Sequence, residues 1–255
     1  MCNEECLRFA SRHLRRQEVD GKDVLEVGAR VVQQPELSLR GTIEALRPRS
    51  YLGVDIEPGP GVDEVCPAEE LASRYGDASF DLVVCTEVLE HVENWRTVVS
   101  NLKQVLRPSG VLLVTTRSRG FPYHGFPHDH WRYEPGDMRA IFSDLEIAAL
   151  EDDRSAPGVL LKALKPAVFE EVDLTDYRLY SVSERTRTSS RLPPPRSAYV
   201  FVLRAGAAAR AAYRAVFPEA VREVIRRHLI RRSWYASQRS SAVDRSAGDA
   251  SRDAR

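Results

Sequence analysis

The chain has 255 residues, 37 of them Lys or Arg and 37 Asp or Glu, so its formal net charge is zero. This length fits one large domain, or one domain with an extension, and allows a substantial buried core. The balanced charge argues against a dedicated nucleic-acid binder, the lack of an 18-residue apolar run against a transmembrane helix, and the charged first residues against a secretory signal, so we expect a cytoplasmic protein.

The first part of the chain predicts helices and strands in alternation. Apolar side chains recur at helical spacing over residues 4–16. Residues 36–47 predict a second helix, with Ser38 as its N-cap and its end before Pro48. Further predicted elements are strands at 24–27, 51–56 and 62–66, a helix at 68–75, and a strand at 80–85. The last strand is a nearly continuous apolar run, which is typical of a strand covered on both faces.

The middle of the chain continues this alternation. A helix is predicted over 95–110, closed by Pro108 and Gly110, and a buried strand over 111–116. Two more strands, around 144–150 and 158–164, lie close enough in sequence to pair antiparallel. Regular alternation of this kind predicts an α/β fold with a mostly parallel sheet that helices cover on both faces.

The last third predicts less regular structure. We expect a core over residues 1–165, an accessory segment with an exposed linker over 166–204, a basic amphipathic helix within 205–235 and a disordered tail over 236–255. The helix around 219–232 carries apolar residues on one side and arginines on the other. It fits a peripheral membrane or protein contact, and equally a helix packed on its own domain with solvated arginines.

Polar residues follow the predicted strands, where doubly wound sheets bind their ligands. Gly28 suits a turn with a positive φ or the close approach of a ligand. Asp55 suits the two hydroxyls of a ribose, or a solvated strand end. Glu87 and Glu90 fall near a predicted helix N-terminus, where the helix dipole favours carboxylates, so a structural role leads for both.

The loop over residues 117–133, RSRGFPYHGFPHDHWRY, combines three histidines with five aromatic residues. Because exposed aromatic area is unfavourable, the loop predicts either a substrate pocket with a histidine base or a packed structural loop. His124, His128 and His130 with Asp129 have spacings compatible with a metal, but a loop rich in Pro and Gly fixes no geometry. No metal site is therefore predicted.

Five segments, in this order, resemble the class I S-adenosylmethionine-dependent methyltransferases over residues 23 to about 165. They are VLEVGAR, YLGVDI, FDLVVCTEVLEHV, QVLRPSGVLLVTTRS and HDHWRY. The EVLEHV and VLRPSG segments are the specific ones, whereas the family's usual G-x-G-x-G turn is reduced here to Gly28. The resemblance implies a Rossmann-like, doubly wound sheet of seven strands with the last one antiparallel, and S-adenosyl-L-methionine as the cofactor.

The resemblance also implies roles for individual positions. Pro67 stands where the family often has an aspartate at the adenine. Since the glycine turn is reduced, we expect Ser38 and Arg40, at the next helix N-terminus, to hold the cofactor's carboxylate. The other implied positions are Glu26 and Gly28 at the methionine part, Asp55 at the ribose, Ile56 and Ala68 at the adenine, Thr86 and Glu87 beside the methyl group, and His91 as the family's EH histidine.

Methyl transfer requires the nucleophile, the methyl group and the sulfur in one line, and an oxygen acceptor also needs a base. We expect His128 as that base, with Asp129 orienting it or serving instead, and His124 or His91 in reserve. Aromatic side chains of the loop are expected to shape a pocket for a hydroxyl of a sugar, glycan or small metabolite: Phe121, Tyr123, Phe126, Trp131 and Tyr133. The alternatives are a methyltransferase fold that has lost catalysis and supports a partner, and a nicotinamide dehydrogenase, which the single glycine disfavours.

Overall fold

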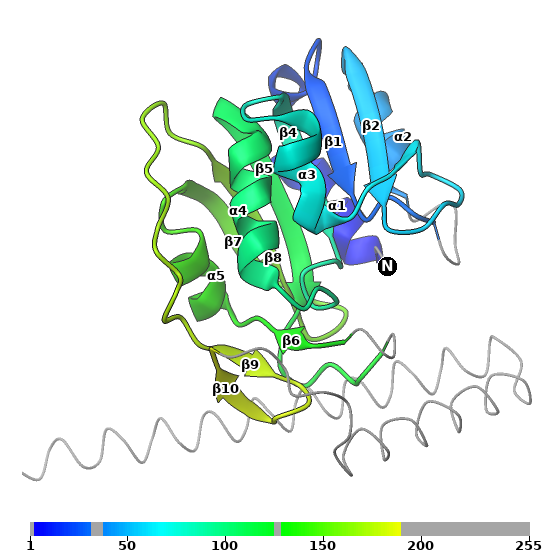
Figure 1. Cartoon of the computed structure of the whole chain (residues 1–255). Helices are drawn as coiled ribbons and strands as arrows, with labels where there is room; N and C mark the ends of the chain where they lie inside the picture. The colour runs from blue at the N-terminus through cyan, green and yellow to red at the C-terminus, as the bar shows by residue number, and fades with distance from the viewer. Residues whose placement is uncertain (1–2, 32–37, 125–128, 190–255) are drawn as a thin grey trace, which may run out of the picture.

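A seven-stranded sheet with the order β3-β2-β1-β4-β5-β8-β7 forms the centre of the molecule (Figure 1). The structure is a computed structural model and describes residues 3–31, 38–124 and 129–189. Neighbouring strands from β3 to β5 pair parallel, and β8 runs antiparallel to both β5 and β7. The strands are β1 Asp23–Val27, β2 Ser50–Asp55, β3 Glu64–Val65, β4 Phe80–Thr86, β5 Leu106–Arg117, β7 Glu146–Asp152 and β8 Gly158–Leu164. The predicted doubly wound, mostly parallel sheet is confirmed.

Helices cover both faces of this sheet because its strands alternate apolar side chains between them (Figure 1). Val24 of β1 packs with α1, Glu4–His13, and α2, Leu39–Glu44, in one core cluster. Leu25 and Val27 point to the other face, where the second core cluster lies. The helices on that face are α3 Leu71–Tyr75, α4 Trp95–Val105 and α5 Pro135–Ile141, and short 3-10 helices span Arg16–Glu18 and Ala68–Glu70.

The junction of α4 and β5 differs from the prediction. The helix ends at Val105, and the segment that contains Pro108 and Gly110 belongs to β5 rather than to the helix end. Its pairing with β4 shifts register between Phe80 and Leu82, and Ser109 takes a positive φ of 63°. The proline and glycine therefore mark an irregular start of a strand, a local signal that reads equally well as a helix stop.

The described part of the expected accessory segment packs on the core. Leu174 and Leu179 belong to the same buried cluster as α4. A small sheet joins β9, Leu179–Ser181, to β6, Trp131–Arg132, and to β10, Thr186–Thr188. Residues up to 188 thus pack with the core, as an accessory segment can, and the predicted domain boundary at 165 stays a prediction. The predicted basic helix and tail lie outside the described residues. No described helix is long and apolar enough to cross a membrane.

Asp23, at the amino end of β1, anchors the edge of the sheet opposite to the strand ends that carry the predicted site. Its Oδ1 accepts hydrogen bonds from Arg49 Nε at 2.8 Å and Ser50 Oγ at 2.7 Å, and Arg107 donates to Oδ2 at 3.0 Å. The hydrogen bonds from Arg49 above all hold the pKa of Asp23 well below its usual value, although burial opposes this.

We predict that Asp23→Asn lowers the free energy of unfolding by about 1–2 kcal/mol at pH 7. A carboxylate whose pKa is depressed on folding stabilises the protein above its unfolded pKa of about 4, and this contribution is lost as the pH falls toward the folded pKa. Urea unfolding of the wild type and the variant at several pH values checks the prediction. The control is Asp20→Asn, whose carboxylate is 41% exposed and pairs with Arg16 and Arg47 at the surface. An equal loss in both variants, or a difference that does not shrink below pH 4, contradicts the prediction.

Candidate active site

The strand ends bring most of the predicted positions to one edge of the sheet. β1, β2 and β4 run parallel, with Val27 opposite both Val54 and Cys85. Asp55 pairs with Val65 of β3, and Thr86 pairs with Thr115 of β5. The residues that follow β1, β2, β3 and β4 therefore lie side by side along a single edge.

The local packing and backbone conformation require a glycine at position 28. It has a φ of 81°, and an added Cβ would lie 2.3 Å from Val88 Cγ2 and 3.3 Å from the carbonyl oxygen of Thr86. Its amide donates to Val54 O at 2.9 Å. The missing side chain thus admits the loop after β4, and any further contact of Gly28 with a cofactor stays a prediction.

Asp55 and Ile56 stand at the end of β2 in positions suited to a nucleoside. Asp55 Oδ2 accepts from the amide of Arg30 at 3.2 Å and Oδ1 from the amide of Glu57 at 3.3 Å, and no described cation pairs with this carboxylate. Ile56 is 61% exposed and Val65, at the end of the adjoining strand, is 50% exposed. An accessible carboxylate beside exposed apolar side chains suits a ribose next to a flat base.

Ala68 and Pro67 lie beyond β3, next to this apolar surface. Pro67 is the N-cap of a 3-10 helix that begins at Ala68. Asn101 of α4 donates to the carbonyl oxygens of Ala68 at 3.0 Å and Glu69 at 2.6 Å, which fixes this turn against the helix.

Ser38 and Arg40 have contacts within the protein. Ser38 caps α2 as predicted, accepting from the amide of Arg40 at 3.3 Å. The Arg40 guanidinium pairs with Asp63, donates to Gly61 O at 3.0 Å and lies 4.4 Å from the centre of the Tyr51 ring. These contacts give Arg40 a structural role, and its predicted contact with the cofactor's carboxylate stays a prediction.

Glu26 is buried within β1, where the Tyr51 hydroxyl donates to its carboxylate. Burial raises the pKa of Glu26 although this hydrogen bond lowers it. Its implied position near the methionine part of a cofactor stays a prediction.

Glu87 and Glu90 do not lie at a helix N-terminus, because α4 begins only at Trp95. Both are buried at the end of β4, after the buried Thr86. Glu87 accepts from Thr115 Oγ1 at 3.0 Å and pairs with Arg117, and burial raises its pKa against the opposing effect of this guanidinium. Buried ion pairing, not the helix dipole, explains Glu87.

Two aromatic residues expected in the pocket belong to the core instead. Trp131 is 2% exposed and donates from Nε1 to Val92 O at 2.9 Å, and Tyr133 is fully buried and donates to Leu89 O at 3.0 Å. Phe121 and Tyr123 are half-buried, and Phe126 lies outside the described residues. The loop is therefore partly a packed structural loop, one of the alternatives that its sequence left open.

Asp129 orients His124. Its carboxylate accepts from Arg132 at 2.5 and 2.9 Å, and from the amide and Nδ1 of His124 at 2.7 and 3.2 Å. Burial opposes ionisation, but Arg132 and His124 together hold the pKa of Asp129 far below its usual value. A carboxylate held this way is a poor proton acceptor and a good positioning group. The predicted base His128 lies outside the described residues.

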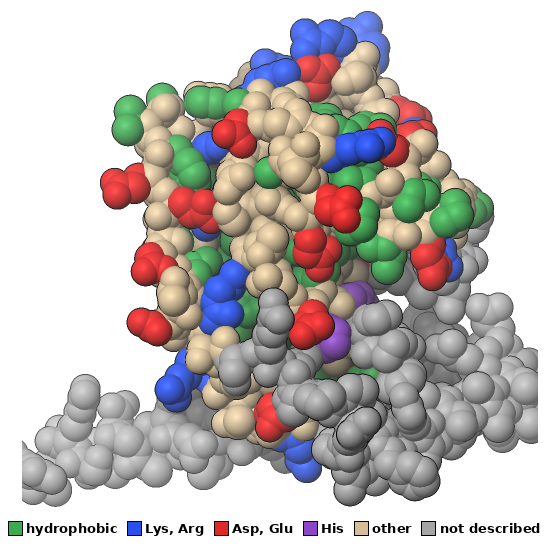
Figure 2. All heavy atoms as spheres, viewed as in Figure 1, with side chains coloured by type: hydrophobic (Ala, Val, Ile, Leu, Met, Phe, Trp, Pro, Cys, Tyr) green, Lys and Arg blue, Asp and Glu red, His purple; other side chains and the backbone are tan. Residues whose placement is uncertain are grey.

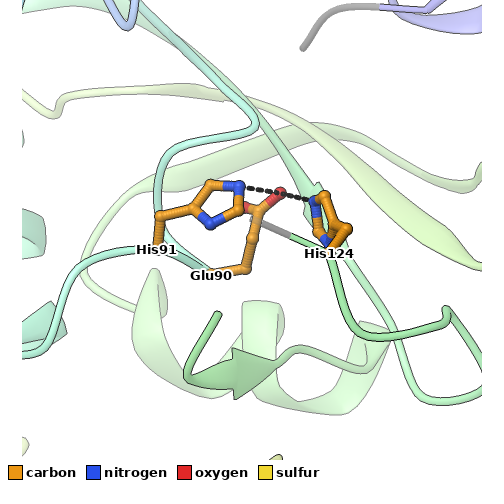
Figure 3. A group of neighbouring side chains, drawn as sticks. All are labelled: Glu90, His91 and His124. Atoms are coloured by element: carbon orange, nitrogen blue, oxygen red, sulfur yellow. Dashed lines mark ion pairs between the residues drawn. The ribbon is translucent and has the colours of Figure 1, made fainter. Parts of the chain in front are cut away.

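His91 and His124 meet Glu90 at this edge (Figure 3). Glu90 Oε1 lies 3.8 Å from His91 Nε2 and 3.9 Å from His124 Nε2, and the two imidazoles stand 4.7 Å apart in an edge-on arrangement. The glutamate is buried, whereas the side chains of His91 and His124 are 27% and 33% exposed. Histidine side chains reach the surface on the face in Figure 2. We call Glu90, His91 and His124 the Glu90 cluster.

Comparison with known proteins agrees with this architecture. Residues 42–114 match the family model described as a methyltransferase domain. The chain is 29% identical over 136 residues to a ubiquinone biosynthesis O-methyltransferase of Idiomarina loihiensis, which is 47% of this chain and 54% of that protein. It is 42% identical over 91 residues to the protein of that name from Rickettsia typhi, covering 29% of this chain and 37% of the relative. The chain thus spans about half the length of these curated relatives, or less.

A solved structure shares the fold. It is the 1,6-didemethyltoxoflavin-N1-methyltransferase of Burkholderia thailandensis, with 1,6-didemethyltoxoflavin and S-adenosylhomocysteine bound. The TM-score is 0.50 at 16% identity, and the match covers 64% of this chain and 80% of that one.

The strand order and the matched model define a Rossmann-like methyltransferase fold. Residues 42–114 are thus similar to a methyltransferase domain, and a solved methyltransferase that shares the fold binds S-adenosylhomocysteine.

Sequence reasoning missed two parts of this edge. Arg117 and Arg132 are buried cations that neutralise the carboxylates, and Glu90 joins both histidines. A charged residue directly after the apolar run of β5 was the available signal for Arg117.

We predict that Gly28→Ala lowers the free energy of unfolding by roughly 1–3 kcal/mol, since the new Cβ meets Val88 at a positive φ. The binding of S-adenosylhomocysteine should weaken with it, because the strand ends must separate. The control is Gly41→Ala in α2, where an added Cβ meets nothing within 4 Å and should stabilise the helix by about 0.5–1 kcal/mol. Urea unfolding and calorimetric titration measure both effects. Unchanged stability of Gly28→Ala contradicts the packing role.

Proposed function

We propose that the chain transfers the methyl group of S-adenosylmethionine to a hydroxyl oxygen of a small molecule that carries a ring. The observation that carries the proposal is the Glu90 cluster, which follows β4 at the carboxyl ends of the strands and in which Asp129 orients His124. The names of the curated relatives, O-methyltransferases, support an oxygen acceptor.

Of the residues at the carboxyl ends of the strands, one set binds the cofactor and another binds the methyl acceptor. Asp55 accepts the ribose hydroxyls, and Ile56 with Val65 covers the adenine. Thr86 and Glu87, at the end of β4, border the methyl group. The acceptor hydroxyl binds against the Glu90 cluster, which removes its proton. The oxygen attacks the methyl carbon, the carbon–sulfur bond breaks toward sulfur, and the products are a methyl ether, S-adenosylhomocysteine and one proton.

The base that we propose from the Glu90 cluster differs from the one predicted from the sequence. Asp129 orients His124, so we assign to His124 the role of base that was predicted for His128. Phe121 stacks edge-on with His124 at 4.8 Å between ring centres, which suits the flat face of a phenol or a sugar ring. A phenol and a monosaccharide are therefore the acceptors to compare first.

We predict that Asp55→Ala weakens the binding of S-adenosylhomocysteine about ten- to hundredfold, because two hydrogen bonds to a charged acceptor are lost. In the wild type the ligand raises the unfolding temperature and NAD does not. The control is Asp77→Ala, an exposed carboxylate outside the candidate site, which should bind like the wild type. Calorimetric titration gives the dissociation constants. No binding by the wild type would overturn the proposed function and favour a methyltransferase fold that only supports a partner.

We predict that His124→Asn slows methyl transfer at least a hundredfold and leaves the binding of S-adenosylhomocysteine within about threefold. The assay measures S-adenosylhomocysteine formed with a panel of phenols, catechols and monosaccharides. The control is His13→Asn. His13, at the end of α1, also pairs with a carboxylate, that of Glu151, but lies outside the candidate site. Equal rates for the wild type and His124→Asn exclude the Glu90 cluster from the reaction.

A further inference from the structure

The Glu90 cluster has the composition and spacing of a cation site. The ligand atoms of Glu90, His91 and His124 all lie within 4.8 Å of one another (Figure 3). Two ligands about 2.0–2.2 Å from a bound ion stand roughly 3.0–3.6 Å apart. The distances of 3.8 and 3.9 Å from Glu90 to the histidines are therefore slightly wider than a bound ion needs, and small side-chain rotations close the difference.

Glu90 lacks a partner for one of its buried oxygens. Its Oε2 accepts from Thr116 Oγ1 at 2.8 Å, but Oε1 has no hydrogen-bond partner and its side chain is fully buried. A buried carboxylate oxygen without a hydrogen bond or a cation is costly. The nearby guanidinium of Arg117 already pairs with Glu87 and with Asp153. Oε1 instead points at the gap between the two imidazoles (Figure 3).

The surroundings of His124 match those of a metal ligand. Nδ1 of His124 faces Asp129 Oδ2 at 3.2 Å, which leaves Nε2, on the side of Glu90, as the nitrogen that can bind an ion. A carboxylate behind the ligating histidine is the usual outer partner at metal sites. Arg132 holds Asp129 in turn, which fixes the direction of the imidazole.

We propose that Glu90, His91 and His124 bind one divalent first-row transition-metal ion, with its open coordination positions facing the methyl acceptor. Two imidazoles and one carboxylate favour Zn²⁺, Mn²⁺ or Fe²⁺ over Mg²⁺ and Ca²⁺. Three protein ligands leave room for a further ligand, and the exposed edges of both histidines give access from solvent.

The role of the ion in catalysis rests on the proposed function. An acceptor hydroxyl that binds the ion loses its proton to water more readily, because the ion stabilises the negative oxygen. With the ion bound, Glu90 and the two histidines are its ligands and no longer the proton acceptor, and the oxygen attacks the methyl carbon as in the proposed function. Binding of the ion does not depend on methyl transfer and is tested separately.

The test uses the full chain without tag histidines, stripped of metal by a chelator and dialysed. Titration with Zn²⁺ is followed by calorimetry and titration with Co²⁺ by visible absorption. We expect one ion per chain. His91→Gln and His124→Gln should each weaken binding at least tenfold, and Asp129→Asn about ten- to hundredfold through its hydrogen bond to His124. His13→Gln, the control for another histidine–carboxylate pair, should bind as the wild type does.

The binding of S-adenosylhomocysteine to the same samples shows that each variant is folded. Wild-type protein that binds this ligand but no stoichiometric ion overturns the metal site and leaves the proposed function standing. Ion binding that is equally tight in both histidine variants also overturns it. Protein that binds one ion through these histidines but no S-adenosylhomocysteine supports the metal site and contradicts the proposed function.

Discussion

Two buried glutamates that follow β4 determine how the side chains around them are arranged. Glu87 and Glu90 are three residues apart, yet they bond to neighbouring threonines of β5, Thr115 and Thr116. Adjacent residues of a strand point to opposite faces of a sheet, so the two carboxylates are drawn to opposite sides of the same edge. The turn between them must be tight, and Glu87 takes a positive φ of 57° within it.

The two buried carboxylates, which lie on opposite faces of the sheet, have different partners. On the α1 side, Glu87 pairs with Arg117, which also pairs with Asp153 at 3.2 Å. On the α4 side, Glu90 faces two partly exposed histidines. Removing one partner of a buried ion pair leaves an uncompensated charge, which typically costs about 3–5 kcal/mol. The first side is thus an ion-pair network within the protein, and the second, where Glu90 Oε1 has no hydrogen-bond partner, is the side on which we propose that the ion binds.

The sequence predicted what depends on local pattern. The sheet, the order of its elements and the cap at Ser38 follow from apolar runs and from the residues that bound them. The predicted end of α4 was wrong because Pro108 and Gly110 are compatible both with the end of a helix and with an irregular start of a strand. Side-chain contacts set by the tertiary structure could not be predicted from the sequence. Nothing in HDHWR shows that Asp129 contacts His124, or that Trp131 is buried in the core.

The turn after β1, whose glycine motif is reduced to Gly28, packs against a loop that supplies two glycines. Arg30 stands where the family's second glycine is expected, and its side chain needs room. Gly59, in the loop after β2, provides it, because a Cβ there would lie 3.1 Å from Arg30 Cγ.

In the same loop, Gly61 has a φ of 88°, and a Cβ on it would lie 2.4 Å from Ala29 O. These two glycines thus let the loop after β2 pack closely against the turn after β1. The amide of Arg30 donates to Asp55, so the turn is joined to the carboxylate that we propose for the ribose. The turn after β1 and the loop after β2 are therefore packed together through glycines of the second segment and joined by the hydrogen bond to Asp55.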